Sequence, residues 1–148
     1  MVGALLLFSS GGNGNDSTPT PGPAFSPSNV DEAAIAALAQ KSIEVMPRNQ
    51  WPSLYGDFTA EFQARCPRDE FIQTGIEAAQ EQGTNLSRLG FVRLEDVSVG
   101  EGQATATIIG EVKSSFEYEV YAAFQKQEGQ WKLAPADGTS GCQAFNRP

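Results

Sequence analysis

The chain has no histidine, only two cysteines and few basic residues, and these shortages exclude several classes of function. Without histidine, every mechanism that needs an imidazole base or an imidazole metal ligand is excluded. Two cysteines alone also argue against a structural zinc site, which takes about four nitrogen or sulfur ligands. We therefore expect no metal site, and we assign no cofactor.

Positive charge is scarce as well, because 18 acidic residues stand against 10 basic ones and give a net charge of −8. Nucleic-acid-binding proteins draw much of their affinity from lysine and arginine side chains that neutralise phosphates. The charge balance therefore excludes nucleic acid and an anionic membrane surface as expected partners. The acidity is typical of a solvated surface, and an acidic patch for cations or for a basic partner is the alternative.

The N-terminal region has an apolar run from Val2 to Phe8, much shorter than the roughly 20 residues that cross a bilayer. We interpret residues 1–8 as the remnant of a signal segment. Residues 9–29 are rich in Gly, Ser, Thr and Pro and predict a disordered tether. The expected localisation is outside the cytoplasm of a bacterium, secreted or tethered to the cell surface. No cysteine follows the apolar run, so the sequence does not support a lipid attached at this point. Membrane contact is expected only through an N-terminal anchor, if there is one.

The two cysteines lie far apart in the sequence and do not form a CxxC pair. Because exported proteins meet an oxidising environment, we expect a disulfide between Cys66 and Cys142. A pair of buried free thiols is the alternative. In the chain-entropy model, closing so long a loop stabilises a fold by roughly 4–5 kcal/mol.

Residues 30–148 are expected to form a single domain that begins with a long helix. Asn29 suits the N-cap position, and acidic residues occupy the first turn. Apolar residues then recur at helical spacing between Ile35 and Met46. Pro47 is expected to end this helix.

Three shorter helices are expected after the first one. A brief helix should end near Gly56, and Thr59 can cap a further turn or two. Pro67 suits the first position of another helix, which Gly83 should stop. Cys66 therefore lies at a junction between two helices, where the chain must turn.

The pattern changes to strands after Gly90. In "FVRLEDVSVG" two pairs of apolar residues are out of phase by one position, which predicts a bulge near Glu95–Asp96. A second strand is expected over "QATATIIGEV", and residues 116–127 then alternate cleanly between apolar and polar side chains. A turn at Glu128–Gly129 leads into the last strand.

The strict alternation of the third strand assigns its side chains to two faces. One face carries Phe116, Tyr118, Val120, Ala122 and Phe124. The other carries Glu117, Glu119, Tyr121 and Gln125, and we expect it to be charged and solvated.

Helices followed by strands predict the α+β class. We expect the helices to pack in the concave face of a curved, mostly antiparallel four-stranded sheet, which gives a cone-like domain. Because the helices do not completely fill the concave side of a bent sheet, such domains often keep a pocket there.

This succession resembles the nuclear transport factor 2-like superfamily, the cystatin-like cone that SnoaL-like proteins and ketosteroid isomerase share. Two segments carry the resemblance: "WPSLYGDFTAEFQARCPRDEF", residues 51–71, and the closing hairpin "YAAFQKQEGQWKLA", residues 121–134. It covers about residues 30–136. Among the members of this superfamily, the chain most resembles exported or lipoprotein-like bacterial proteins of unknown role.

The resemblance implies an isomerase or a dehydratase as one alternative. Such enzymes pair a carboxylate base with a tyrosine or histidine inside the cone, and histidine is absent here. The residues left for that chemistry are Asp57, Asp96, Tyr55, Tyr118 and Tyr121. No catalytic motif of the family maps onto these positions residue by residue, so we assign no catalytic residue.

As a set the aromatic residues indicate an apolar pocket, although for any one of them core packing is the preferred interpretation. We expect the pocket to be lined by Trp51, Tyr55, Phe58, Phe62, Phe116, Tyr118, Phe124 and Trp131. Such a wall suits a small apolar or amphipathic ligand.

The first functional hypothesis is therefore a tethered, non-catalytic accessory or binding domain. The small enzyme described above is its alternative. A purely structural protein-interaction module is a third, and it predicts a filled cone and an exposed apolar sheet face. A homodimer through the sheet face is a further partner to test, although Glu117 and Glu119 disfavour a dry symmetric contact.

Overall fold

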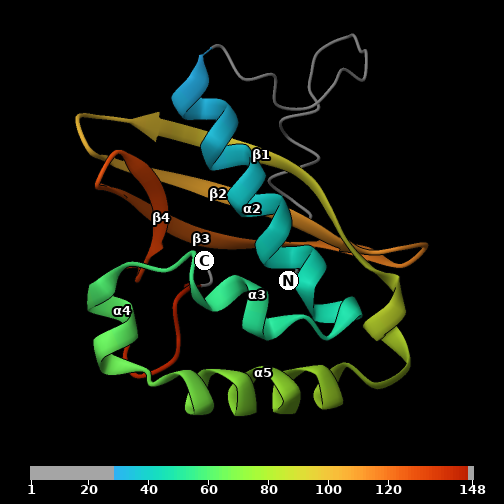
Figure 1. The fold of residues 1–148 in the computed structure, drawn as a ribbon. Coiled ribbons are helices and arrows are strands. Elements are labelled where there is room, and N and C mark those ends of the chain that lie inside the picture. Colours follow the sequence, from blue (N-terminus) through green and yellow to red (C-terminus); the bar gives the residue numbers. More distant parts are fainter. Residues whose placement is uncertain (1–28, 147–148) are drawn as a thin grey trace, which may run out of the picture.

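The structure, a computed structural model, describes residues 29–146 and shows an α+β fold in which the helices precede the strands (Figure 1). The predicted signal remnant, residues 1–8, and the tether up to residue 28 lie outside the described residues. The elements are α2 (Val30–Arg48), α3 (Trp51–Tyr55), α4 (Ala60–Arg65), α5 (Arg68–Gln82), the 3-10 helix η2 (Gly83–Arg88), β1 (Leu89–Val99), β2 (Gln103–Val112), β3 (Phe116–Gln127) and β4 (Gln130–Ala134).

Helix α2 begins where the sequence predicts, at Asn29. The Asn29 side chain accepts a hydrogen bond of 2.9 Å from the Glu32 amide, which satisfies one of the free donors of the first turn. The helix does not end at Pro47 but continues to Arg48, and Asn49 ends it in the left-handed conformation with φ 54°. A proline in the last turn removes only one hydrogen bond, so the helix tolerates it.

The shorter helices follow the sequence pattern with small shifts. Thr59 caps α4 by accepting a hydrogen bond of 3.2 Å from the Phe62 amide, as predicted. Pro67 lies at the N-cap of α5 rather than at its first helical position. Gly83 ends α5 as predicted, with φ 54°, and the chain then turns through η2, which the sequence pattern did not predict.

The four strands form one antiparallel sheet in the order β1-β2-β3-β4. Its register shifts between Glu95 and Ser98, and Asp96 has φ 53°, so the predicted bulge is confirmed. A second irregularity, between Phe91 and Arg93, was not predicted. The predicted turn between β3 and β4 is confirmed as well, and its glycine, Gly129, has φ 80°.

The helices lie on one side of the sheet, so the predicted fold class is confirmed (Figure 1). We call the face that α2 covers the inner face and the opposite one the outer face. The core fills the space between the helices and the inner face, and its largest fully buried side chains include Ile35, Phe62, Ile108, Phe124 and Leu133. Burying such side chains is the main source of stability for a domain of this size.

The predicted disulfide is confirmed, because Cys66 and Cys142 are joined with their Cα atoms 4.9 Å apart. It fastens residues 138–146, which we call the C-terminal strap, to the junction between α4 and α5. Arg65 holds the same strap by donating to the Gly141 carbonyl (2.8 Å) and the Thr139 hydroxyl (2.9 Å). At the far end of the strap, the backbones of Tyr121 and Asn146 exchange two hydrogen bonds. The strap therefore forms an antiparallel bridge with β3.

Candidate functional site

An inner cavity of about 540 Å³ lies between the inner face of the sheet, the helices α2, α3 and α5, and the C-terminal strap. Its volume falls within the range of about 300–1,000 Å³ that is usual for small-molecule sites. Six aromatic side chains are in its wall: Trp51, Phe58, Phe71, Phe116, Tyr118 and Phe145. The cavity is therefore the candidate functional site of the described residues.

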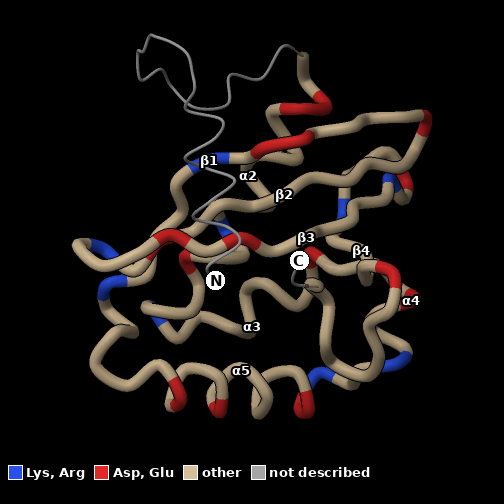
Figure 2. Tube along the Cα trace, turned by 180° about the vertical axis from the view of Figure 1, so that it is seen from behind, with Lys and Arg blue, Asp and Glu red and all other residues tan. Residues whose placement is uncertain are grey.

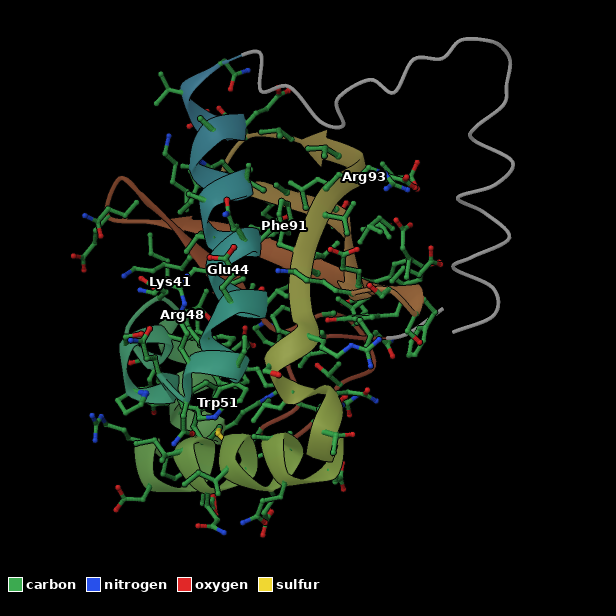
Figure 3. The ribbon with its side chains drawn as sticks, turned by 90° about the vertical axis from the view of Figure 1, so that its right-hand side faces the viewer. Lys41, Glu44, Arg48, Trp51, Phe91 and Arg93 are labelled. Atoms are coloured by element: carbon green, nitrogen blue, oxygen red, sulfur yellow. A yellow bond between two sulfur atoms is a disulfide. The ribbon has the colours of Figure 1, made fainter. Side chains whose placement is uncertain are left out.

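The position of Trp51 depends on a glycine in the neighbouring helix. A Cβ atom on Gly75 would lie 2.6 Å from Cε2 and 2.7 Å from Cγ of the Trp51 ring, closer than real Cβ contacts. Gly75 therefore lets the indole ring lie directly on α5, and Figure 3 shows Trp51 just above that helix. Phe71 makes an edge contact with the same ring, with centroids 6.1 Å apart.

Tyr118 has a similar glycine opposite it on the inner face. Gly110 and Tyr118 are paired across β2 and β3, and a Cβ atom on Gly110 would lie 2.6 Å from the tyrosine Oη. The ring of Tyr118 therefore covers the bare backbone of β2, a contact that a larger residue at position 110 would block.

No charged side chain among the described residues lines the inner cavity. Its polar groups are neutral ones, and Ser42 already donates to the Ala39 carbonyl at 2.7 Å. The indole N–H of Trp51 differs, because it is buried and finds no acceptor among residues 29–146. An unmet donor of this kind is uncommon in a protein interior.

The C-terminal strap forms part of the wall of the cavity, and this was the contribution that the sequence pattern missed. Cys142, Ala144 and Phe145 all line the inner cavity. The sequence of this segment shows neither a helical nor a strand pattern. Its only sequence signal was the pair of apolar residues that follows Cys142, which is too short to show a periodicity.

Four of the eight residues predicted to line a pocket do line this one: Trp51, Phe58, Phe116 and Tyr118. Phe116 is exposed and stands at its rim. The other four lie elsewhere. Phe62 and Phe124 are buried in the core, at 0% and 2% exposure.

Tyr55 and Trp131 are held away from the inner cavity by their polar atoms. The Tyr55 hydroxyl donates to the Cys66 carbonyl at 2.8 Å. The Trp131 indole N–H donates to Asp31 at 2.8 Å, beside Lys126 on the far side of α2. That hydrogen bond, and then Lys126, lower the pKa of the Asp31 carboxyl.

The acid and tyrosine candidates do not meet in the inner cavity. Asp57 forms an ion pair of 2.6 Å with Lys41 outside it. Asp96 and Tyr121 line a different hollow, a groove of about 710 Å³ that also takes in Thr107 and Asp137. Tyr118 alone of the five candidates lies in the inner cavity.

The outer face of the sheet is charged, but it is less solvated than the sequence predicted. Figure 2 views this side of the molecule, and Figure 3 shows Arg93 pointing away from α2. Arg93 forms ion pairs with Glu95 at 2.7 Å and with Glu117 at 3.6 Å. The expectation of a solvated face is wrong for Glu119, which is only 3% exposed.

Burial has a clear electrostatic effect on these two glutamates. It raises the pKa of Glu117, an effect that the neighbouring Arg93 guanidinium opposes. Burial is also the first cause of the raised pKa of Glu119, and the negative charges of Glu95 and Asp96 add to it. A carboxyl group in such surroundings takes up a proton more readily than one in water.

Among residues 29–146 there is no group of side chains suited to hold a metal ion. No helix in this part of the chain is long and apolar enough to cross a membrane. No protein-family model matches the chain, and no curated protein sequence matches it.

Proposed function

We propose that this domain binds a small, uncharged, apolar or amphipathic ligand in its inner cavity, as a non-catalytic accessory or binding protein that works outside the cytoplasm. The observation that carries the proposal is the wall of the cavity. It contains six aromatic side chains and, among the described residues, no charged one. Apolar surface with a few fixed polar groups is what small-molecule sites usually offer.

The disulfide supports the proposed compartment. Bonds of this kind persist in oxidising surroundings such as the periplasm or the cell exterior, and are rare in the cytosol. In this protein the bond has a further use, because it fastens a wall of the proposed site. An exported bacterial origin, a tether and any N-terminal anchor rest on the sequence before residue 29 and stay predictions.

Membership of the nuclear transport factor 2-like superfamily also stays a prediction. The arrangement of helices on one face of an open antiparallel sheet supports it. Architecture alone does not carry a function, so the proposal here rests on the cavity and not on the resemblance.

The proposal can be tested with Nile red, an uncharged dye whose fluorescence rises in apolar surroundings. We expect saturable binding to the intact domain, and we expect Ala78→Phe to weaken it at least about tenfold, because Ala78 lines the cavity and a phenyl ring there would occupy the space of a ligand. Ala33→Phe is the matched control, since Ala33 is exposed on α2 and does not line the cavity. Equal binding by the two variants would remove the basis of the proposal.

The enzyme alternative is favoured by one observation, the presence of Asp96 and Tyr121 in the wall of the groove of about 710 Å³, which we call the outer groove. A carboxylate base and a tyrosine donor are the pair that an isomerase of this kind would need. The groove is a separate place from the inner cavity, so the two proposals can be told apart. The alternative would be established if the protein had isomerase or dehydratase activity and if both Asp96→Asn and Tyr121→Phe lost that activity while still binding Nile red.

A homodimer through the outer face remains a prediction about partners. Arg93 and Glu117 are partly buried and already pair with each other. The buried carboxylate of Glu119 would have to be matched across such a contact, which makes a dry interface costly. The third hypothesis, a structural module with a filled cone, requires that the 540 Å³ of the inner cavity be closed to ligands, and the Nile red titration decides this.

A further inference from the structure

We infer that the ligand of the inner cavity is a straight aliphatic chain of about twelve carbons with an uncharged polar head, and that it lies along α5. A fatty alcohol or a fatty-acid ester has this chemistry. The inference rests on the proposed function and adds to it the chemical class and the orientation of the ligand.

The first step of the argument is the length of the cavity. The residues that α5 contributes to its wall recur at the three- and four-residue spacing of one helix face: Phe71, Thr74, Gly75, Ala78 and Gln82. Phe71 and Gln82 are eleven positions apart, and a helix rises about 1.5 Å per residue, so the cavity follows α5 for about 16 Å.

The second step is the end of the cavity at Gln82. Leu89, Val112 and Phe116 line the cavity and form one row across β1, β2 and β3, because Val112 is the cross-strand partner of both other residues. Figure 1 shows the start of β1 and the turn between β2 and β3 on the side of the C-terminal end of α5. Phe116 is 38% exposed, so this end is open to solvent.

The third step is the opposite end, which is closed. Phe71 and Phe58 line the cavity there with their ring centroids 5.4 Å apart, and they are only 6% and 2% exposed. Cys142 lines the same end, because its disulfide joins it to Cys66, just before α5 begins. An apolar tail that enters at Phe116 therefore ends among buried aromatic rings.

The fourth step is the width of the cavity. A cavity of about 540 Å³ that extends for about 16 Å is on average about 6 Å across, whereas a compact body of that volume would be about 10 Å across. The cavity therefore suits a long, narrow molecule. An extended chain advances about 1.2 Å per bond, as a polypeptide does, so about twelve carbons and a head atom match the length.

The fifth step concerns the head of the ligand. The cavity has no lysine or arginine in its wall among the described residues, so a bound carboxylate or phosphate would have no cation to compensate its lost hydration. Gln82, at the open end, has a neutral amide that can donate and accept hydrogen bonds. A hydroxyl or an ester oxygen is therefore the head that suits this end.

The experiment measures how straight-chain alcohols displace Nile red from the intact domain, from hexanol through octanol, decanol and dodecanol to tetradecanol. Each added methylene buries more apolar surface, so we expect the affinity to rise about fourfold per methylene up to about dodecanol. Tetradecanol should bind no more than about twofold more tightly than dodecanol, because its last carbons find no room in the cavity.

Cyclododecanol is the control for shape, and it needs no variant of the protein. It has the carbon number and the hydroxyl of dodecanol, but it is a wide ring. We expect it to bind at least about tenfold more weakly than dodecanol, because a narrow cavity must distort to admit it.

Thr74→Phe should shorten the cavity from its closed end. Thr74 is exposed, lines the cavity and lies about one helical turn from Phe71, so a phenyl ring there takes away about 5.4 Å, the length of about four carbons. We expect the rise in affinity to stop at about octanol, while hexanol binds as it does to the wild type. Gln73→Phe is the matched control, since Gln73 is exposed on α5 and does not line the cavity.

The outcomes separate this inference from the proposed function. If Nile red binds but cyclododecanol displaces it as well as dodecanol does, or if the affinity keeps rising at tetradecanol, the inference is overturned and the apolar site stands. If neither Nile red nor any alcohol binds at concentrations up to its solubility, the inference and the proposed function fall together. A Thr74→Phe variant that weakens every chain length equally would overturn the orientation along α5.

Discussion

Ile108 and Ile109 are neighbours on β2 and are 0% and 1% exposed, yet they face opposite sides of the sheet. Ile108 lies on the inner face, in the core beneath the helices. Ile109 lies on the outer face, where its cross-strand partners are Arg93 and Glu119. Two identical side chains are thus buried equally, one by hydrocarbon and the other among charged residues.

These two isoleucines show that burial alone does not indicate a binding site. The inner face keeps a cavity whose wall, in the described part of the chain, is rich in aromatic side chains and carries no charged one. The outer face buries charged groups, but the Arg93 guanidinium already pairs with the carboxylates of Glu95 and Glu117. The chemistry of the groups that line each side therefore decides which side suits an uncharged ligand.

The largest effect should come from removing the disulfide that closes the inner side. Replacing both Cys66 and Cys142 by serine is expected to lower the free energy of unfolding by about 2–5 kcal/mol, because the bond joins residues 76 positions apart. Nile red binding should weaken as well, since the strap loses its covalent attachment. Urea titrations of the oxidised wild type and the variant measure the first effect.

The wild-type protein reduced with a phosphine is the control for the disulfide experiment, because it keeps both cysteines. It should match the double-serine variant in stability and in dye binding. Unchanged Nile red affinity in both would show that the strap does not help to form the site, even if stability falls.

A smaller difference in the free energy of unfolding should appear when Ile108 and Ile109 are replaced by alanine in separate variants. We expect Ile108→Ala to lower the free energy of unfolding by about 3–4 kcal/mol, because the tightly packed inner core cannot collapse into the space that the deleted side-chain atoms leave. We expect Ile109→Ala to lower the free energy of unfolding by only about 2 kcal/mol, since the flexible stems of Arg93 and Glu119 can settle into the gap. Each variant is the control for the other, and chemical denaturation measures both. Equal costs would mean that the outer face is packed as rigidly as the inner one.

Much of the fold could be predicted from local sequence signals. Asn29 with acidic residues after it marks a helix start, and the change of phase in β1 marks the bulge at Asp96. The pairing of Cys66 with Cys142 followed from their number and the expected compartment. Each of these signals acts within a few residues or leaves few alternatives.

The candidate site was harder to predict because it depends on contacts between distant segments. Trp51 meets Gly75 because α3 packs on α5. The strap lies at the cavity, where the disulfide, Arg65 and the edge of β3 all hold it. Alternation correctly separated Glu119 from the inner face, but it cannot show how deeply an outer face is buried. For this reason the solvated environment expected for Glu119 was wrong.

The smallest expected effect concerns that buried carboxylate. The pKa of Glu119 is raised above its ordinary value of 4.5, first by burial and then by Glu95 and Asp96. Between the unfolded and the folded pKa the native state holds more protons than the unfolded state, so stability falls as pH rises through this window. At neutral pH the raised pKa of Glu119 therefore lowers the stability of the fold, whereas below the ordinary glutamate pKa of 4.5 this penalty is absent.

Glu119→Gln removes the charge and keeps the shape, so we expect it to be more stable than the wild type at neutral pH. The advantage should shrink as pH is lowered toward the ordinary glutamate pKa, because the wild-type carboxyl then becomes neutral as well. Glu101→Gln, at an exposed turn, is the matched control and should not show this pattern. Thermal unfolding across pH measures the difference between the variants. If Glu119→Gln were less stable at every pH, the ionised carboxylate would be serving as a partner to Arg93, and the outer face would depend on its charges for stability as the inner face depends on its apolar packing.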